Sequence, residues 1–273
     1  MTSVISREDT RTTTTDEWDV ADDGWGRRAV DFATLSEPGS CREFVTLHHR
    51  LDISLGERLL DVSCGSGLAL ELARVRGAEC AGIEASHRLV AIARDRNPDS
   101  DLRVGDGHAL PWDDESFDVA TSFRGIWAST PSAIREVHRV LVRGGRVGLT
   151  TWGQLRRSPG TWAYTPFRIA DVGPFEHEAS LELGTPGAGE EFLTRHGFVD
   201  VERFDVPMVW EFADPYTYAR TLASTGPAYE AIESIGETAF IEAAIHQAQK
   251  LVRDGLPLRA PIDVVGYVAR KPF

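Results

Sequence analysis

The stretch Leu59-Leu60-Asp61-Val62-Ser63-Cys64-Gly65-Ser66-Gly67 decides the fold of this 273-residue chain. Its first four residues form a short, mainly apolar run that is typical of a buried parallel strand. Two glycines then let a ligand approach the backbone closely, because no Cβ intervenes. Leu68 and Leu72 follow at helical spacing. The stretch therefore predicts a ligand site at the carboxyl end of a strand, where open α/β sheets bind their ligands.

The same strand-and-helix rhythm continues along the chain. Further short apolar runs occur at residues 80–83, 102–104, 117–122 and 147–150, and segments with apolar residues at helical spacing lie between them. The helix before the last of these runs is expected to end at Gly144-Gly145. Such alternation predicts an α/β fold, with an open, mostly parallel sheet that helices cover on both faces.

Four regions are expected in the chain. Residues 1–17 are polar and predict a disordered tail, and residues 18–56 predict a cap of two helices. Residues 57–152 form the ligand-binding core, and residues 153–273 complete the sheet. A helical block between the last two strands is long for a connection, so we predict a lid over about 153–188 and 213–258.

A dinucleotide site is the obvious rival for the glycine loop. Its fingerprint, Gly-x-Gly-x-x-Gly, needs a third glycine for close contact between helix and strand. Counting from Gly65, that position holds Leu70. This departure disfavours NAD or FAD.

Polar residues follow the next strands in order. Glu84 ends the second strand, where it is placed to accept hydrogen bonds from ribose hydroxyls, and Ala85 follows it. The run Gly105-Asp106-Gly107-His108 follows the third strand, where Asp106 is placed to meet an adenine amino group. Gly-Asp-Gly is also a good turn by itself, and capping of the following turn is the alternative reading of Asp61. Ser122 ends the fourth strand.

Taken together, these motifs resemble the class I S-adenosylmethionine-dependent methyltransferases, especially the ubiquinone- and menaquinone-biosynthesis type. The resemblance rests on the glycine loop, Glu84, Asp106 with Leu110-Pro111-Trp112, Phe117-Asp118-Val119, and Arg139-Val140-Leu141 through Gly145. It covers residues 57–152 well and 189–212 loosely. It implies a Rossmann-like sheet with an antiparallel last strand, and S-adenosyl-L-methionine as cofactor with S-adenosyl-L-homocysteine as product.

The resemblance also implies roles for single residues. Asp61, Ser63, Gly65 and Gly67 would surround the methionine part, with Cys64 among them as a small buried residue. Glu84 with Ala85 would hold the ribose, Asp106-Gly107 with His108 the adenine, and Ser122 would lie near the sulfonium. One departure is that Ser63 stands at the family's first loop glycine, a position that tolerates small residues.

The amino-acid composition disfavours several classes of binding partner. Lys and Arg number 29 against 42 Asp and Glu, a formal charge of −13, which disfavours a nucleic-acid substrate. The start of the chain lacks the apolar core of a signal peptide, and no run approaches the length of a membrane span. Three cysteines without paired spacing predict free thiols in a cytoplasmic protein and no metal site.

We therefore expect metal-free methyl transfer to an O, N or C atom of a small, partly apolar or aromatic metabolite. Trp25, Arg124 and Trp127 are the candidate acceptor residues, the last two because they directly follow the fourth strand. No catalytic residue is assigned. The alternatives are a fold relative that binds the cofactor but catalyses a cyclisation or decarboxylation, and a non-catalytic binding partner.

Overall fold

The computed structural model describes residues 22–170 and 181–273 of the chain. Its centre is a seven-stranded sheet with the strand order β3-β2-β1-β4-β5-β7-β6 within those residues. The strands are β1 (Arg58–Val62), β2 (Glu79–Glu84), β3 (Asp101–Val104), β4 (Phe117–Phe123), β5 (Leu141–Trp152), β6 (Val199–Phe212) and β7 (Leu258–Arg270). Strands β1 to β5 pair in parallel, whereas β7 runs antiparallel to both β5 and β6. The predicted fold class is therefore confirmed.

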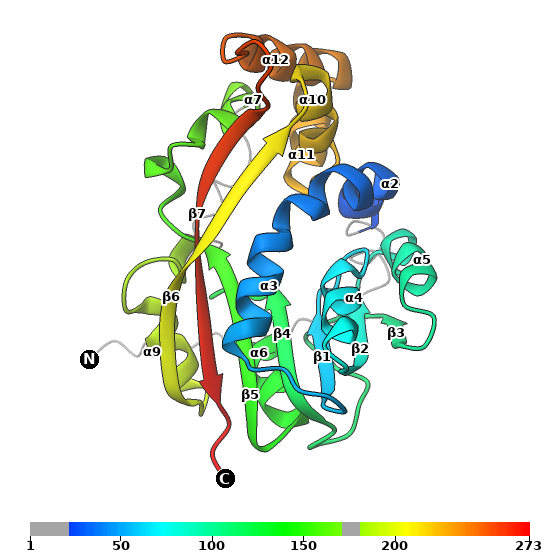
Figure 1. The fold of residues 1–273 in the computed structure, drawn as a ribbon, viewed down its shortest axis with the longest axis vertical. Helices are drawn as coiled ribbons and strands as arrows, with labels where there is room; N and C mark the ends of the chain where they lie inside the picture. Colours follow the sequence, from blue (N-terminus) through cyan, green and yellow to red (C-terminus); the bar gives the residue numbers. More distant parts are fainter. Residues whose placement is uncertain (1–21, 171–180) are drawn as a thin grey trace, which may run out of the picture.

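Apolar residues on both faces of the sheet explain why helices cover it twice. Leu59 and Val119 face one core, whereas their neighbours Leu60 and Ala120 face the other, and all four are fully buried. Helices α3 (Cys41–Arg50), α4 (Leu68–Val75) and α5 (His87–Arg96) pack on the first face, and α6 (Pro131–Val140) and α9 (Ala188–Arg195) pack on the second (Figure 1). Burial on both faces is the usual setting of parallel strands.

One local prediction was wrong. Helix α6 ends at Val140 rather than at Gly144-Gly145, because the chain passes directly into β5 and Gly144 bonds the C-terminal segment, with its N–H 2.9 Å from the carbonyl oxygen of Lys271. The expected N-terminal helices are present, as a run of short helical pieces that leads into α3. These are η1 (Asp22–Gly26), α2 (Ala29–Asp31), η2 (Phe32–Ser36) and η3 (Glu37–Ser40).

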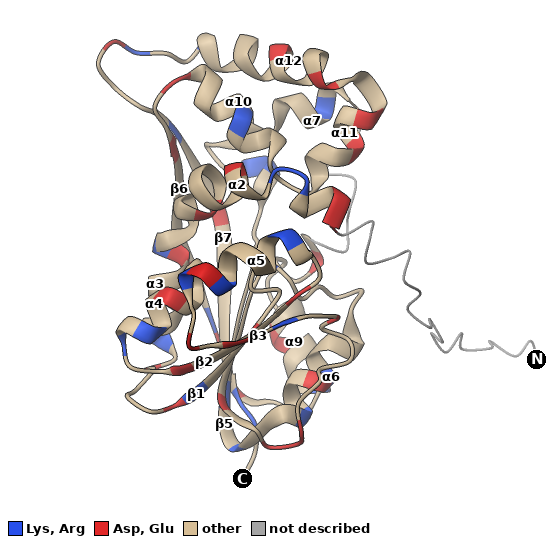
Figure 2. Cartoon of the chain, turned by 90° about the vertical axis from the view of Figure 1, so that its right-hand side faces the viewer, with Lys and Arg blue, Asp and Glu red and all other residues tan. Residues whose placement is uncertain are grey.

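A second layer lies beyond the carboxyl ends of the strands. Strands β6 and β7 continue past the end of β5 as a long antiparallel pair and lead into a group of helices (Figure 1). The group comprises η4 (Leu155–Arg157), η5 (Thr161–Tyr164), α7 (Thr165–Ile169), α10 (Pro215–Ala223), α11 (Pro227–Ile235) and α12 (Glu237–Gln249). Figure 2 shows α2 between α5 of the core and this upper group.

The predicted domain boundaries stay predictions, and the expected tail at residues 1–17 lies outside the described residues, as does part of the expected lid. None of the helices in residues 22–170 and 181–273 combines the length and apolar character that a bilayer span demands.

Candidate functional site

The loop between β1 and α4 has an unusual backbone. Ser63, Gly65 and Gly67 have φ angles of 63°, 55° and 82°, all in the left-handed region. Glycine adopts this region without strain, whereas a residue with a Cβ does so at a cost of about 1–2 kcal/mol. Ser63 is therefore the strained member of the loop. Its side chain is exposed, so the site opens to solvent at this point.

Asp61 lies at the floor of the loop and is 1% exposed. The hydroxyl of Thr121 on β4 donates a 2.7 Å hydrogen bond to its Oδ1 atom. Burial raises the pKa of Asp61 to about 8, the net result after the Thr121 hydrogen bond lowers it and the nearby Glu37 and Glu84 carboxylates add to the rise. A cation bound at this edge would favour the charged form of Asp61.

Glu84 ends β2 and turns towards the same loop. Its Oε2 atom accepts the N–H of Gly65 at 3.1 Å, and its Oε1 atom accepts the N–H of Ser86 at 3.0 Å. Burial raises the pKa of Glu84, and these backbone bonds, with one from Ala85, oppose the rise. A carboxylate has about four lone-pair positions, so Glu84 keeps acceptor capacity for hydroxyl groups of a ligand.

Cys64 fixes the glycine loop to strand β2. Its N–H donates to the carbonyl oxygen of Ile83 at 3.0 Å, and its thiol is buried, which raises the thiol pKa well above its usual value. A Cβ on Gly82 would lie 2.9 Å from both the Cys64 sulfur and Leu70 Cδ1. The close contact between helix and sheet is therefore permitted by a glycine on β2, whereas the dinucleotide fingerprint places that glycine on the helix.

The third turn, after β3, holds Asp106, Gly107 and His108. The Asp106 Oδ1 atom accepts the N–H of His108 at 2.8 Å, which is the side-chain turn that Gly-Asp-Gly favours. Burial opposes ionisation of Asp106, but the bonds from His108 outweigh it and lower the Asp106 pKa. A Cβ on Gly107 would lie 2.9 Å from Val62, so this turn packs against the end of β1.

Ser122 and Gly125 join β4 to the loop. The Ser122 hydroxyl donates to the carbonyl oxygen of Val62 at 2.8 Å and is therefore held by the backbone. A Cβ on Gly125 would lie 2.5 Å from Ser63 Cβ and 2.9 Å from Ser122 Oγ. The turn after β4 thus packs directly against the glycine loop.

Arg124 occupies that turn with a left-handed φ of 61°. Its Nη2 atom donates to Ser40 Oγ at 2.7 Å and lies 3.0 Å from Glu43 Oε2, and its Nε atom donates to Glu43 Oε1 at 3.2 Å. Glu43 is fully buried. The guanidinium also lies over the ring of Trp152, 4.6 Å from its centroid. Arg124 is therefore a rigid group whose charge Glu43 balances.

The other two acceptor candidates have structural contacts of their own. Trp127 donates its indole N–H to the carbonyl oxygen of Arg124 at 2.9 Å, so it braces the turn. Trp25 packs edge-on against Phe32 and touches the backbone at Gly226, just before α11. Trp25 thus links the N-terminal segment to the upper helices.

An aromatic cluster lies beside Arg124. The ring of Trp152 is 6.2 Å from Tyr164 and 6.2 Å from Trp210, and the last two rings are 5.6 Å apart. Tyr164 and Trp210 are buried. Burial raises the pKa of the Tyr164 phenol, so this group stays protonated.

Sequence reasoning missed three acidic residues of the N-terminal segment. Glu43 pairs with Arg124, Glu37 contacts Ser66 in the glycine loop, and Asp22 accepts the hydroxyl of Ser86 at 2.5 Å. Their partners lie 29 to 81 residues away along the chain. No local pattern in the sequence signals such contacts.

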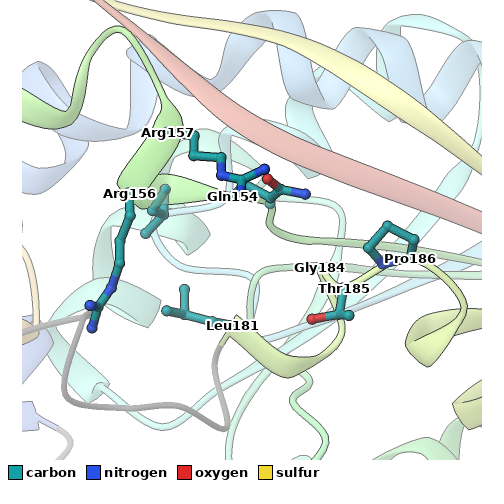
Figure 3. A pocket seen from close by; sticks show the side chains of 9 residues that line it. Gln154, Arg156, Arg157, Leu181, Gly184, Thr185 and Pro186 are labelled. Carbon is teal, nitrogen blue, oxygen red and sulfur yellow. The ribbon is translucent and has the colours of Figure 1, made fainter.

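Two pockets lie away from this edge. One, of about 360 Å³, lies just beyond β5 and is lined by Leu181, Thr185, Pro186 and residues 153–157 (Figure 3). The other, of about 500 Å³, lies at the amino ends of β1 and β2 and includes Arg58 and Glu79. Neither pocket contains a predicted site residue. The predicted cofactor residues instead line the turns after β1, β2, β3 and β4.

These turns fit an adenosyl cofactor. The ligand-facing chemistry consists of left-handed glycine backbone, two carboxylates that can accept from hydroxyls or attract a cation, and a polar turn after β3.

Known proteins agree with this description. Residues 60–149 match the family model described as a methyltransferase domain. An uncharacterised methyltransferase of Synechocystis sp. is 31% identical over 175 residues, which cover 63% of this chain and 80% of that protein. A demethylmenaquinone methyltransferase of Chlorobaculum tepidum is 36% identical over 96 residues, covering 33% of this chain and 40% of that enzyme.

Solved structures share the fold. A phosphoethanolamine N-methyltransferase of Haemonchus contortus, in complex with S-adenosylhomocysteine, is 18% identical, covers 94% of this chain and 60% of that chain, and has a TM-score of 0.60. The [4+2]-cyclase SpnF is 25% identical, the match covers 85% of this chain and 81% of that chain, and the TM-score is 0.53. The Synechocystis match spans most of that relative, and the domain match contains the glycine loop. The chain therefore belongs to the class I S-adenosylmethionine-dependent methyltransferases, and S-adenosylmethionine is its cofactor.

Proposed function

We propose that this enzyme transfers the methyl group of S-adenosylmethionine to an O, N or C atom of a small, neutral molecule with an apolar or aromatic body. The observation that carries the proposal is the turn at Arg124-Gly125. One side of it packs against Ser63 in the glycine loop, and the other side stacks on Trp152 in the aromatic cluster. The cofactor site and the acceptor site would thus share this turn as a common wall.

The charge balance favours a neutral acceptor. Glu43 already compensates Arg124, so an added anion would meet an ion pair that carries no net charge. Burying an unpaired charge is costly, whereas rings of an acceptor would stack well on Trp152. Figure 2 shows acidic and basic residues both distributed over the elements of the core, and a phosphate-binding track would need basic residues gathered together.

Within this proposal, Asp61, Ser63, Gly65 and Gly67 hold the methionine part of the cofactor. Glu84 with Ala85 holds the ribose, Asp106-Gly107 with His108 holds the adenine, and Ser122 keeps the end of β4 against the loop. The cofactor supplies a methyl group on a sulfonium, which is already an activated leaving group.

The protein's own contribution would be positioning and exclusion of water. Holding reactants in line can supply about 7–11 kcal/mol of barrier lowering. Tyr164 cannot take a proton, because its phenol stays protonated, and it would instead orient the acceptor through packing. A general base is not required when the acceptor atom is a neutral amine or an acidic hydroxyl.

Calorimetric titration with S-adenosylmethionine and S-adenosylhomocysteine tests the cofactor seat. The Glu84→Ala variant should bind at least about tenfold more weakly, equal to about 1.4 kcal/mol. Glu79→Ala is the matched control, because Glu79 begins the same strand but is exposed at its other end. Equal affinity in wild type and Glu84→Ala would remove Glu84 from the seat.

One observation supports the alternative of an enzyme that does not methylate, namely the likeness to a protein described as a [4+2]-cyclase. Both reactions use the same seat, so product analysis separates them where binding does not.

A further inference from the structure

Glu37 is a buried carboxylate that reaches the centre of the glycine loop. It begins η3 in the N-terminal segment, and its side chain is 5% exposed. Its Oε1 atom accepts the N–H of Ser66 at 3.1 Å, and its Oε2 atom accepts the Ser66 hydroxyl. Ser66 is fully buried and lies between the two loop glycines. A residue from outside the loop thus holds both polar groups at its centre.

Arg96 at the end of α5 completes this contact. Its Nη1 atom lies 2.5 Å from Glu37 Oε2 and donates to the Ser66 hydroxyl oxygen at 2.9 Å and the Ser66 carbonyl oxygen at 3.2 Å. Its Nη2 atom donates to the carbonyl oxygen of Ala33 at 2.8 Å. The guanidinium therefore compensates the buried carboxylate and ties it to both segments.

The contact bears directly on Gly65. A Cβ built there would lie 3.1 Å from Glu37 Oε1 and 3.3 Å from Phe32 Cε1. Glu37 and Phe32 thus line one side of Gly65, while Glu84 accepts the Gly65 N–H. A shift of the peptide unit that carries the Ser66 N–H would rotate the unit that carries the Gly65 N–H, because the two units meet at the Cα atom of Gly65.

We propose that Glu37 is a positioning residue for the cofactor seat, acting through Ser66 to fix the peptides of the glycine loop. This inference rests on the proposed role of the loop. Charge-assisted hydrogen bonds in a buried site are stronger than neutral ones, so a carboxylate is well suited to the task. Helix α4 begins after Gly67, which has no side chain to cap it, and a carboxylate near that end is also electrostatically favourable.

The experiment is calorimetric titration of the full chain with S-adenosylhomocysteine at a temperature where every variant is folded by circular dichroism. Glu37→Gln keeps the shape and removes the charge, and its dissociation constant should rise about tenfold, as expected for one charge-assisted hydrogen bond. Asp31→Asn is the matched control. Asp31 lies in the same segment and is also largely buried, but its partners are Arg28 and Arg220 on α10. Its dissociation constant should stay within about twofold of wild type.

A double-mutant cycle with Ser66→Ala separates positioning from general destabilisation. If Glu37 acts through Ser66, the double variant should lose less affinity than the two single losses together. Additive losses, or a Glu37→Gln affinity equal to wild type, would overturn the inference while leaving the proposed function intact. If Glu37→Gln does not fold, Ser66→Ala alone must still weaken binding several-fold. Failure of the wild type to bind would overturn both.

Discussion

Gly67 offers a sharp test of how the glycine loop is packed, because the chain contains a matched position. Gly67 and Gly187 each precede an eight-residue helix, and both are left-handed, with φ angles of 82° and 88°. A Cβ on Gly187 would meet nothing within 4 Å. A Cβ on Gly67 would lie 2.7 Å from Asn97 Nδ2 and 3.0 Å from Ala93 Cα. The two alanine variants therefore share the backbone strain and differ in the clash.

The magnitudes follow from these contacts. Alanine in the left-handed region costs about 1–2 kcal/mol of stability in either variant. Alanine also lowers the conformational entropy of the unfolded chain, which offsets about 0.4–1 kcal/mol of that cost. Overpacking adds about 1–3 kcal/mol at Gly67 alone. The neighbours cannot yield easily, because Ala93 Cα is helix backbone and Asn97 Nδ2 donates to the carbonyl oxygens of Gly67 and Ala93 at 3.0 and 3.1 Å. Gly67→Ala should therefore be less stable than Gly187→Ala by about 1–3 kcal/mol.

Urea unfolding followed by tryptophan fluorescence measures this difference through the shift in midpoint at constant slope. S-adenosylhomocysteine affinity, measured on both variants, should fall only for Gly67→Ala. Equal midpoints for the two variants would refute the packing described for the loop.

Three further perturbations probe the site. Arg124→Leu leaves the buried Glu43 carboxylate without its ion-pair partner and should lower the free energy of unfolding in urea by about 3–5 kcal/mol. The double variant Arg124→Leu with Glu43→Leu should recover most of this loss. A double variant as unstable as the single one would contradict the pairing. Because the folded-state pKa of Asp61 is raised to about 8 from its ordinary value of 3.8, its contribution to stability is full below about pH 4 and is lost as pH rises towards 8. The stability of Asp61→Asn relative to wild type should therefore increase over that window, and a constant difference would argue against a buried, protonated Asp61. Ser63→Gly relieves left-handed strain of about 1–2 kcal/mol but adds chain entropy, so a small net stabilisation in thermal unfolding is expected, and a loss above about 1 kcal/mol would show that the Ser63 side chain contributes packing.

The sheet could be predicted because its signals are local. Strand β1 with its glycine loop is read from nine consecutive residues, and the alternation up to Trp152 repeats the same pattern. The antiparallel last strand was expected from the resemblance, and the structure confirms it. The end of α6 was predicted wrongly because Gly144-Gly145 imitates a helix stop, whereas Gly144 bonds the C-terminal segment.

The contacts around the site could not be predicted, since they join distant segments. Glu43 and Arg124 are 81 residues apart, and neither belongs to a periodic pattern that would mark a buried ion pair. Trp152 meets Trp210 because β7 pairs with both β5 and β6 and so brings β6 near the end of β5. Charged and aromatic residues of this kind look like ordinary surface or core residues until the fold joins them.

The most direct test of the proposed reaction is transfer of an isotopically labelled methyl group. The purified enzyme would be incubated with methyl-labelled S-adenosylmethionine and a panel of neutral aromatic and quinone-like hydroxyl or amine compounds, with matched carboxylates as the anionic set. Liquid chromatography and mass spectrometry would follow both S-adenosylhomocysteine and labelled product. We predict that the two appear in equal amounts with at least one neutral acceptor, and that Glu84→Ala abolishes both at low cofactor concentration. Conversion of an acceptor without release of S-adenosylhomocysteine would contradict methyl transfer and favour a cofactor-bound cyclase or decarboxylase.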